Sequence, residues 1–190
     1  MKLKMFLAAS ALALALPSAA FAHARVSPSV GLKGQLELYT LAVPTEEENA
    51  TTTTIEFTPP SGFGIDSFVP SPGWTRHVQQ TGSGENAVIT KVTWSGGNVP
   101  TGEDSAFSFL ASPSDAKTYT FGVRQTYSNG KVVDWTGPES SDTPAPTIDA
   151  KSSIGGGTST LSIIALVVAG VALVLGVVAL VSRKGGRALA

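Results

Sequence analysis

The stretch TYTFGVRQTYSNGKVVDW, residues 118–135, decides the fold class. Its first ten residues alternate between two faces, which is typical of a strand with one buried side. One face carries Tyr119, Phe121, Val123, Gln125 and Tyr127. The Asn129-Gly130 pair that follows is a hairpin signal, because Asn and Gly tolerate the positive φ of a tight turn. The next segment, 131–135, returns as a second strand, so the stretch predicts an antiparallel hairpin.

The same pattern of short strands and turn residues extends back toward the N-terminus. Six more strands are predicted, at 35–43, 51–58, 65–69, 74–80, 88–94 and 106–111, and the segment 95–102, which contains two adjacent glycines, is predicted to be a loop. Outside one apolar run near the C-terminus, no segment has helical periodicity. About eight short strands at this spacing predict an all-β domain, an antiparallel β-sandwich of the immunoglobulin-like or cupredoxin-like kind.

The C-terminal part predicts a membrane anchor. Residues 161–181 read LSIIALVVAGVALVLGVVALV, an uncharged run of the roughly 20 residues that one transmembrane helix needs. Basic residues follow in the tail, 182–190, and such residues favour the cytoplasmic side. Everything before the span is therefore expected outside the membrane. From Pro138 to Thr160 the composition changes to Ser, Thr, Pro, Gly and Asp, and a flexible stalk is predicted over 147–160.

The N-terminus has the pattern of a secretory signal, predicted over residues 1–22. Such a signal combines a charged start, an apolar run and small residues before the cut, which here are Lys2 and Lys4, Met5–Leu16, and Ala20 and Ala22. Cleavage after Ala22 would leave His23 as the first residue of an ectodomain spanning 23–146. A cut after Ala24 is the alternative, because Ala22-His23-Ala24 has the same small-x-small form, and it would remove the histidine.

The exported part is acidic and contains no cysteine. Between residues 23 and 160 lie eight Lys or Arg and 14 Asp or Glu, a formal charge of −6. This charge argues against binding to nucleic acid or to anionic lipid headgroups. Without disulfides the domain depends on core packing, and without thiolates any metal site would use nitrogen and oxygen ligands.

A histidine at a free N-terminus can chelate one metal ion through its α-amine and its ring Nδ1. Nitrogen ligands favour copper among the common divalent ions, so His23 is a candidate copper ligand; the alternative is a histidine that merely follows the cleavage site. The chain has one other histidine, His77, which we expect on the surface of a strand. No nucleophile elbow, phosphate loop or zinc-binding helix motif is present, so we do not predict an enzyme.

A copper site on His23 would also need an anionic oxygen. Glu103, Asp104 and Asp134 are the candidates, and each is equally compatible with an ordinary solvated carboxylate. Trp135 follows the last of these. It is compatible either with core packing or with shielding an open face of the metal.

Several motifs, in this order and spacing, resemble the YcnI-like copper-binding family, formerly the domain of unknown function DUF1775. They are His23 after the signal, Pro70–Trp74, Gly102-Glu103 before Phe107-Ser108-Phe109, Gln125–Gly130 and Val133–Pro138. The resemblance runs from His23 to about Pro146 and implies a β-sandwich that binds one Cu(II). Its ligands would be a single-histidine brace, a glutamate and a nearby tryptophan, which correspond here to His23, Glu103 and Trp135. The family pattern has a second acid just before the Phe-x-Phe strand, where this chain has Ala106. If that second acid is the family's ligand, Glu103 or Asp104 would substitute for it from the loop.

The resemblance implies a single-pass protein of the bacterial cell membrane that binds copper outside the cytoplasm. Its expected partners are the copper ion and a membrane copper transporter or copper chaperone. Two alternatives remain open. One is a metal-free ectodomain that binds another protein, and the other is a copper-dependent oxidase, which is less favoured because the polysaccharide-oxidising enzymes build their brace from two histidines.

Overall fold

The computed structural model describes residues 23–155 and 160–184, which belong to two compact units divided at Ser152 and Ser153. The predicted signal, 1–22, lies outside the described residues. The first unit is built from strands, with one short 3₁₀ turn, η1 (Gly84–Asn86). The strands are β1 (Arg25–Ser27), β2 (Val30–Leu32), β3 (Glu37–Pro44), β4 (Thr51–Thr58), β5 (Phe63–Phe68), β6 (Thr75–Thr81), β7 (Val88–Pro100), β8 (Asp104–Pro113), β9 (Thr118–Thr120), β10 (Gly122–Tyr127), β11 (Val132–Trp135) and β12 (Thr147–Lys151).

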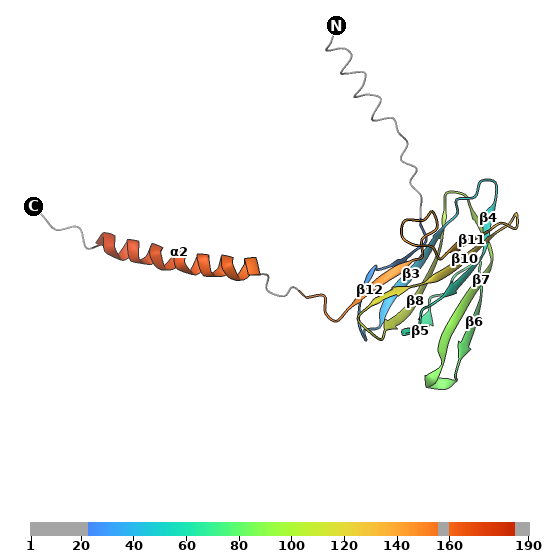
Figure 1. The fold of residues 1–190 in the computed structure, drawn as a ribbon, viewed down its shortest axis with the longest axis horizontal. Coiled ribbons are helices and arrows are strands. Elements are labelled where there is room, and N and C mark those ends of the chain that lie inside the picture. Colours follow the sequence, from blue (N-terminus) through green and yellow to red (C-terminus); the bar gives the residue numbers. More distant parts are fainter. Residues whose placement is uncertain (1–22, 156–159, 185–190) are drawn as a thin grey trace, which may run out of the picture. The chain divides into compact units, whose positions relative to one another are not determined.

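The strands form three sheets (Figure 1). A four-stranded sheet has the order β1-β3-β8-β5, and a five-stranded sheet has the order β11-β10-β4-β7-β6. Every pairing in these two sheets is antiparallel. A small third sheet, β2-β12-β9, contains one parallel pair, β2 with β12. The predicted antiparallel β-sandwich is confirmed.

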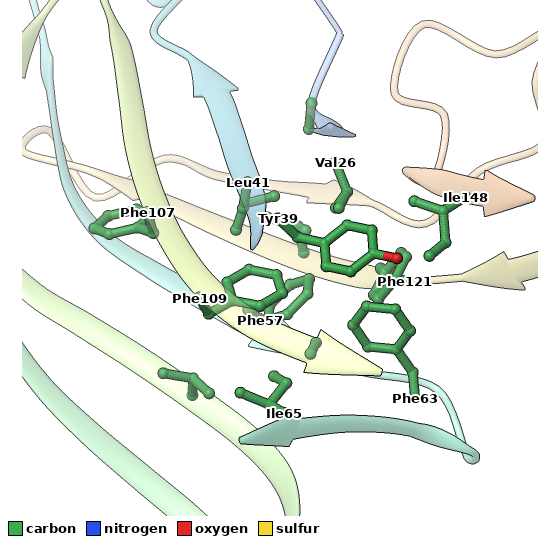
Figure 2. Close-up of a cluster of buried hydrophobic side chains, with 14 of the residues drawn as sticks. Val26, Tyr39, Leu41, Phe57, Phe63, Ile65, Phe107, Phe109, Phe121 and Ile148 are labelled. Atoms are coloured by element: carbon green, nitrogen blue, oxygen red, sulfur yellow. The ribbon is translucent and has the colours of Figure 1, made fainter. Parts of the chain in front are cut away.

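Aromatic side chains from both large sheets fill the core (Figure 2). Phe57 of β4 lies 5.4 Å from Phe109 of β8, measured between ring centroids, and 5.3 Å from Phe121. The contact between Phe57 and Phe109 joins the two large sheets, and Phe121, between β9 and β10, packs on it. Fully burying one such side chain contributes about 1.5–3 kcal/mol, so a core of this composition holds the domain together without disulfides.

The prediction of a loop over 95–102 is wrong, because β7 continues to Pro100. The register between β7 and β4 shifts here, so extra residues of β7 form a bulge. Gly96 in the bulge has a φ of 85°, a conformation that favours glycine. At Gly97 a Cβ would come within 2.1 Å of the Trp74 ring. The two glycines therefore mark a bulge and a close packing contact inside a strand, where the sequence suggested a turn.

Two further boundaries differ from the prediction. The strand expected over 118–127 is two strands, because the chain passes from the small sheet (β9) to the five-stranded sheet (β10) at Phe121. The first five residues of the predicted stalk form β12, which pairs with both β2 and β9. Ile148 and Ala150 of β12 are only 1% and 2% exposed. The domain therefore extends past its predicted end at residue 146.

Helix α2 (Thr160–Lys184) lies in the described part of the second unit. Its segment Thr160–Ser182 has a mean hydropathy of 3.1 and no buried residues within the structure. The helix is thus long and apolar enough to cross a membrane, at the position where the sequence predicted a span.

Candidate metal centre

Strand β1 places His23 at one end of the four-stranded sheet. In the antiparallel register, Arg25 of β1 lies opposite Ala42 of β3, and Pro44 lies opposite Asp104 of β8. If this register is continued by two residues toward the N-terminus, His23 lies opposite Pro44. His23 itself is exposed. Its ring is therefore accessible to an ion from solution.

Glu103 and Asp104, the two carboxylates predicted before β8, lie at this same end of the sheet. The backbone around Glu103 is held in place, because its carbonyl accepts a hydrogen bond from the Thr45 N–H at 2.9 Å. Asp104 Oδ2 lies 3.5 Å from Arg25 Nη2 in an exposed ion pair. Within residues 23–155, no ion pair involves Glu103. Of these two carboxylates, Asp104 is already engaged by an arginine and, among the described residues, Glu103 is not.

The third candidate carboxylate, Asp134, lies on a different surface. It pairs with Arg124 at 3.6 Å on the outer face of the five-stranded sheet. Because neighbouring side chains of a strand point to opposite faces, Asp134 points outward while Trp135 points into the core. The structure does not bring Asp134 to His23. The other histidine, His77, is exposed on β6, the edge strand of that same sheet, as predicted.

Trp135 is fully buried and belongs to the hydrophobic core. Its Nε1–H donates to Oε1 of Gln125 at 3.0 Å. Gln125 is also fully buried, and its Nε2 donates to the Pro44 carbonyl at 2.8 Å and to Oγ1 of Thr52 at 2.7 Å. The side chain of Gln125 thus connects Trp135 to Pro44, the residue that lies level with His23. The contact between Trp135 and a metal stays a prediction.

A groove of about 610 Å³ lies beside His23. One wall is β1, including Arg25, and the other is the segment 137–147, which contributes Glu139. This segment is folded onto itself, since the Ala145 N–H donates to the Gly137 carbonyl at 2.9 Å. Sequence analysis did not single out Glu139, because it lies in a segment without strand periodicity and more than 100 residues from His23.

The acidic turn after β3 adds carboxylates at the same end of the sheet. Glu46 is exposed two residues beyond Pro44, and its backbone is hydrogen-bonded to the Tyr127 hydroxyl. Glu47 is engaged by Lys131 at 2.5 Å, and this hydrogen bond lowers the pKa of Glu47. By composition alone, this acidic run is typical of a solvated surface turn. Only its position after β3, level with His23, makes Glu46 relevant to a metal.

Within the described residues, no three His, Asp or Glu side chains lie close enough together to hold a metal ion. Copper at His23 would therefore need a ligand atom of another kind. The α-amine of a chain that begins at His23 is such an atom. The donor set at this end of the domain, one imidazole and several exposed carboxylates, suits a divalent ion that accepts nitrogen and oxygen ligands.

The family model described as domain of unknown function (DUF1775) matches residues 23–150. The chain belongs to the DUF1775 family. The match begins at His23 and ends within β12, so the DUF1775 domain includes both the candidate metal ligand and the last strand. The family predicted from the sequence motifs is confirmed.

Two known proteins resemble this DUF1775 protein along most of their length. The copper-binding protein CutI of Bacillus subtilis (strain 168) is 31% identical over 184 residues, which are 87% of this chain and 88% of CutI. An uncharacterized protein from Nocardia farcinica, whose crystal structure has an immunoglobulin-like fold, is 30% identical with a TM-score of 0.57. That match covers 67% of this chain and 97% of the Nocardia chain. It agrees with the sandwich described above.

Proposed function

We propose that this DUF1775 protein is an exported, membrane-anchored copper-binding protein. The observation that carries the proposal is its similarity to CutI, a copper-binding protein by name, over 88% of the length of CutI. The structure supports it by placing an exposed histidine at the start of the matched domain. The protein binds and passes on copper and does not catalyse a reaction.

The proposed site is a single-histidine brace at a mature N-terminus. The α-amine and Nδ1 of His23 chelate one Cu(II), Glu103 supplies an anionic oxygen, and Trp135 lies on the inner side of the site. Asp104, paired with Arg25, and Glu47, paired with Lys131, are also at this end. Glu46 and Glu139 are two further exposed carboxylates there, and glutamine variants of Glu103, Glu46 and Glu139 distinguish these three. An exposed ion with few protein ligands can be taken over by the ligands of a partner. This property suits copper exchange with a membrane transporter or chaperone.

The helix α2 anchors the domain. In the proposed orientation the basic tail is cytoplasmic, and the copper site is on the other side of the membrane. Chelation by an amine and an imidazole requires both groups to be deprotonated, so protons compete with copper. Copper affinity is therefore expected to fall as the pH is lowered.

The decisive experiment compares two samples of the chain beginning at His23 in detergent micelles, one with a free α-amine and one whose α-amine is acetylated. Titration with Cu(II), followed by electron paramagnetic resonance, should show one bound ion for the first sample and strongly weakened binding for the second, because acetylation converts the amine into an amide. The matched control is His77→Ala, which should bind like the parent. Equal binding by the free and the acetylated chain would refute the brace.

The same titration identifies the oxygen ligand. Glu103→Gln, Glu46→Gln and Glu139→Gln each remove one charge with little change in shape, and only the true ligand should change the copper spectrum. If the chain beginning at His23 binds no copper, the proposed function is wrong.

A further inference from the structure

We infer that Gln125 is a positioning residue for the proposed copper site, and that it holds Trp135 and the end of β3 in one fixed arrangement at the end of the domain where His23 lies. This inference rests on the proposed function. The inference goes beyond the proposed function because it assigns a role to a residue that would not touch the metal.

Both ends of the Gln125 amide are engaged in the core. Its oxygen accepts the indole N–H of Trp135, and its nitrogen donates to the Pro44 carbonyl and to Thr52. The orientation of the amide is set by these partners, because an N–H donor lies on one side and a carbonyl acceptor on the other. Gln125 therefore fixes where the edge of the Trp135 ring lies relative to the end of β3.

The chain of hydrogen bonds continues from Gln125 to the backbone of Glu103, the predicted carboxylate ligand. Oγ1 of Thr52 lies 2.7 Å from Oγ1 of Thr45, and both threonines are at most 2% exposed. The Thr45 N–H then donates to the carbonyl of Glu103, and the Thr45 carbonyl accepts from Gly102. Trp135 and Glu103, which are far apart in sequence, are thus connected through buried polar groups.

A core position facing inward on β10 would ordinarily hold an apolar residue, as Val123 does two residues earlier. Burying a glutamine instead is costly unless all its polar atoms are hydrogen-bonded. A fully bonded buried network restricts its members to one geometry. Around metals, such supporting hydrogen bonds orient the groups that form the site, and removing one commonly weakens binding by about 10–100-fold.

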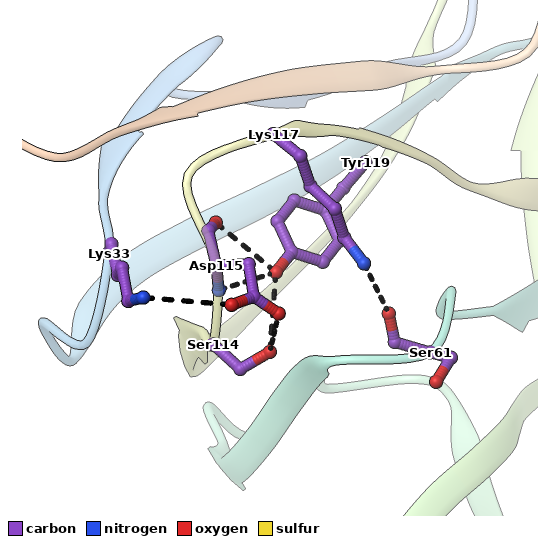
Figure 3. A network of polar contacts seen from close by, with 6 residues as sticks. All are labelled: Lys33, Ser61, Ser114, Asp115, Lys117 and Tyr119. Carbon is purple, nitrogen blue, oxygen red and sulfur yellow. Dashed lines mark hydrogen bonds and ion pairs between the residues drawn. The ribbon is translucent and has the colours of Figure 1, made fainter.

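A second polar network provides the comparison, at the end of β8 remote from Asp104 (Figure 3). There the Tyr119 hydroxyl accepts the N–H of Asp115 at 2.9 Å, and Asp115 lies 3.6 Å from Lys33. Tyr119 is 1% exposed, and the hydrogen bonds of its hydroxyl are partly buried, whereas those of Gln125 are buried. Because β8 begins at Asp104 and Asp115 follows its other end, Tyr119→Phe removes partly buried hydrogen bonds at the end of β8 away from Asp104.

The test uses the full-length chain beginning at His23, with Gln125→Leu and Thr52→Val as variants and Tyr119→Phe as the matched control. Copper affinity is measured by competition with a chelator, and the Cu(II) spectrum is recorded by electron paramagnetic resonance. All samples are measured where circular dichroism shows them folded. We expect Gln125→Leu to weaken copper binding about 10–100-fold and to change the copper hyperfine coupling. Thr52→Val should weaken copper binding and change the hyperfine coupling to a smaller degree. Tyr119→Phe should change neither the copper affinity nor the spectrum.

The outcomes are distinct. Unchanged affinity and spectrum in Gln125→Leu, or equal losses in Gln125→Leu and Tyr119→Phe, would overturn the inference and leave the proposed function intact. If Gln125→Leu does not fold, Thr52→Val decides, because it keeps the shape of the core and removes one hydrogen bond of Gln125. A parent chain that binds no copper would overturn the proposed function and this inference together, before any variant is made.

Discussion

Replacing Gly97 with alanine should displace Trp74 from its position on the core. An added Cβ would lie 2.1, 2.3 and 2.6 Å from three carbons of the Trp74 ring, whereas ordinary contact begins at 3.4 Å. The ring must therefore move by about 1 Å or more. Trp74 meets Phe107 edge to face at 5.0 Å, and Phe107 stacks on Trp94 at 4.2 Å. The displacement is thus transmitted to the buried aromatic cluster.

The expected cost follows from this contact. Forcing extra volume into a packed region typically costs about 1–3 kcal/mol. Loss of one edge-to-face aromatic contact, which is worth about 0.5–1.5 kcal/mol, can account for part of that cost. Gly97, unlike Gly96, has no positive φ, so backbone strain adds nothing. We expect the free energy of unfolding to fall by about 1–3 kcal/mol.

Urea unfolding of the full-length chain in detergent micelles, followed by circular dichroism, measures this loss. Gly64→Ala is the matched control, because it makes the same change in strand β5, where the nearest atom to a new Cβ is the Ser112 carbonyl oxygen at 3.7 Å. Its effect should stay within about 0.5 kcal/mol.

A Trp74→Leu background tests the cause. If the clash with the ring is responsible, the cost of Gly97→Ala should shrink when the ring is absent, since contacting residues are energetically coupled. An undiminished cost in that background, or no cost in the parent chain, would refute the steric explanation.

Two other predictions concern the core. A chain ending at Ser152 should fold, whereas a chain ending at Pro146 should not. The shorter chain lacks β12 and with it the buried side chain of Ile148. A cooperative thermal transition in the shorter chain would contradict this domain boundary. The pKa of Tyr39 is raised in the folded protein, mainly by burial and then by the hydrogen bond to Glu37. The protonated Tyr39 side chain therefore contributes fully to stability below the unfolded-state pKa of about 10. This contribution is lost as the pH rises through the pKa of Tyr39 in the folded protein. Tyr39→Phe should therefore flatten the alkaline fall of the melting temperature, and an unchanged slope would argue against this role for Tyr39.

Local patterns predicted most of the fold. The alternation in 118–135 and its Asn-Gly pair were enough for the β10–β11 hairpin, and alternation in β8 predicted its buried Phe107 and Phe109. The errors occurred where local and long-range preferences disagree. Gly96 and Gly97 are turn residues by local preference, but pairing with β4 keeps them in a strand. The start of the predicted stalk is a strand because two neighbours in the small sheet pair with it.

The candidate site divides in the same way. His23 was recognised from a processing signal, which depends only on contiguous residues. Glu139 beside His23, and the chain from Trp135 through Gln125 to Pro44, were not recognised. Gln125 and Pro44 are 81 positions apart in the chain, and no periodicity in one segment indicates which distant carbonyl its side chain will meet.

The amino-acid sequence alone determined the antiparallel class, the family, the long apolar C-terminal helix and the histidine at the start of the domain. Alternation, turn chemistry, hydropathy and motif order could show these features because all of them act between near neighbours. Tertiary structure alone decided the bulge at Gly97, the inclusion of β12, the separation of Asp134 from His23 and the buried hydrogen bonds of Gln125. These features depend on how two sheets pack face to face, and that packing sets distances between residues whose positions in the sequence are unrelated.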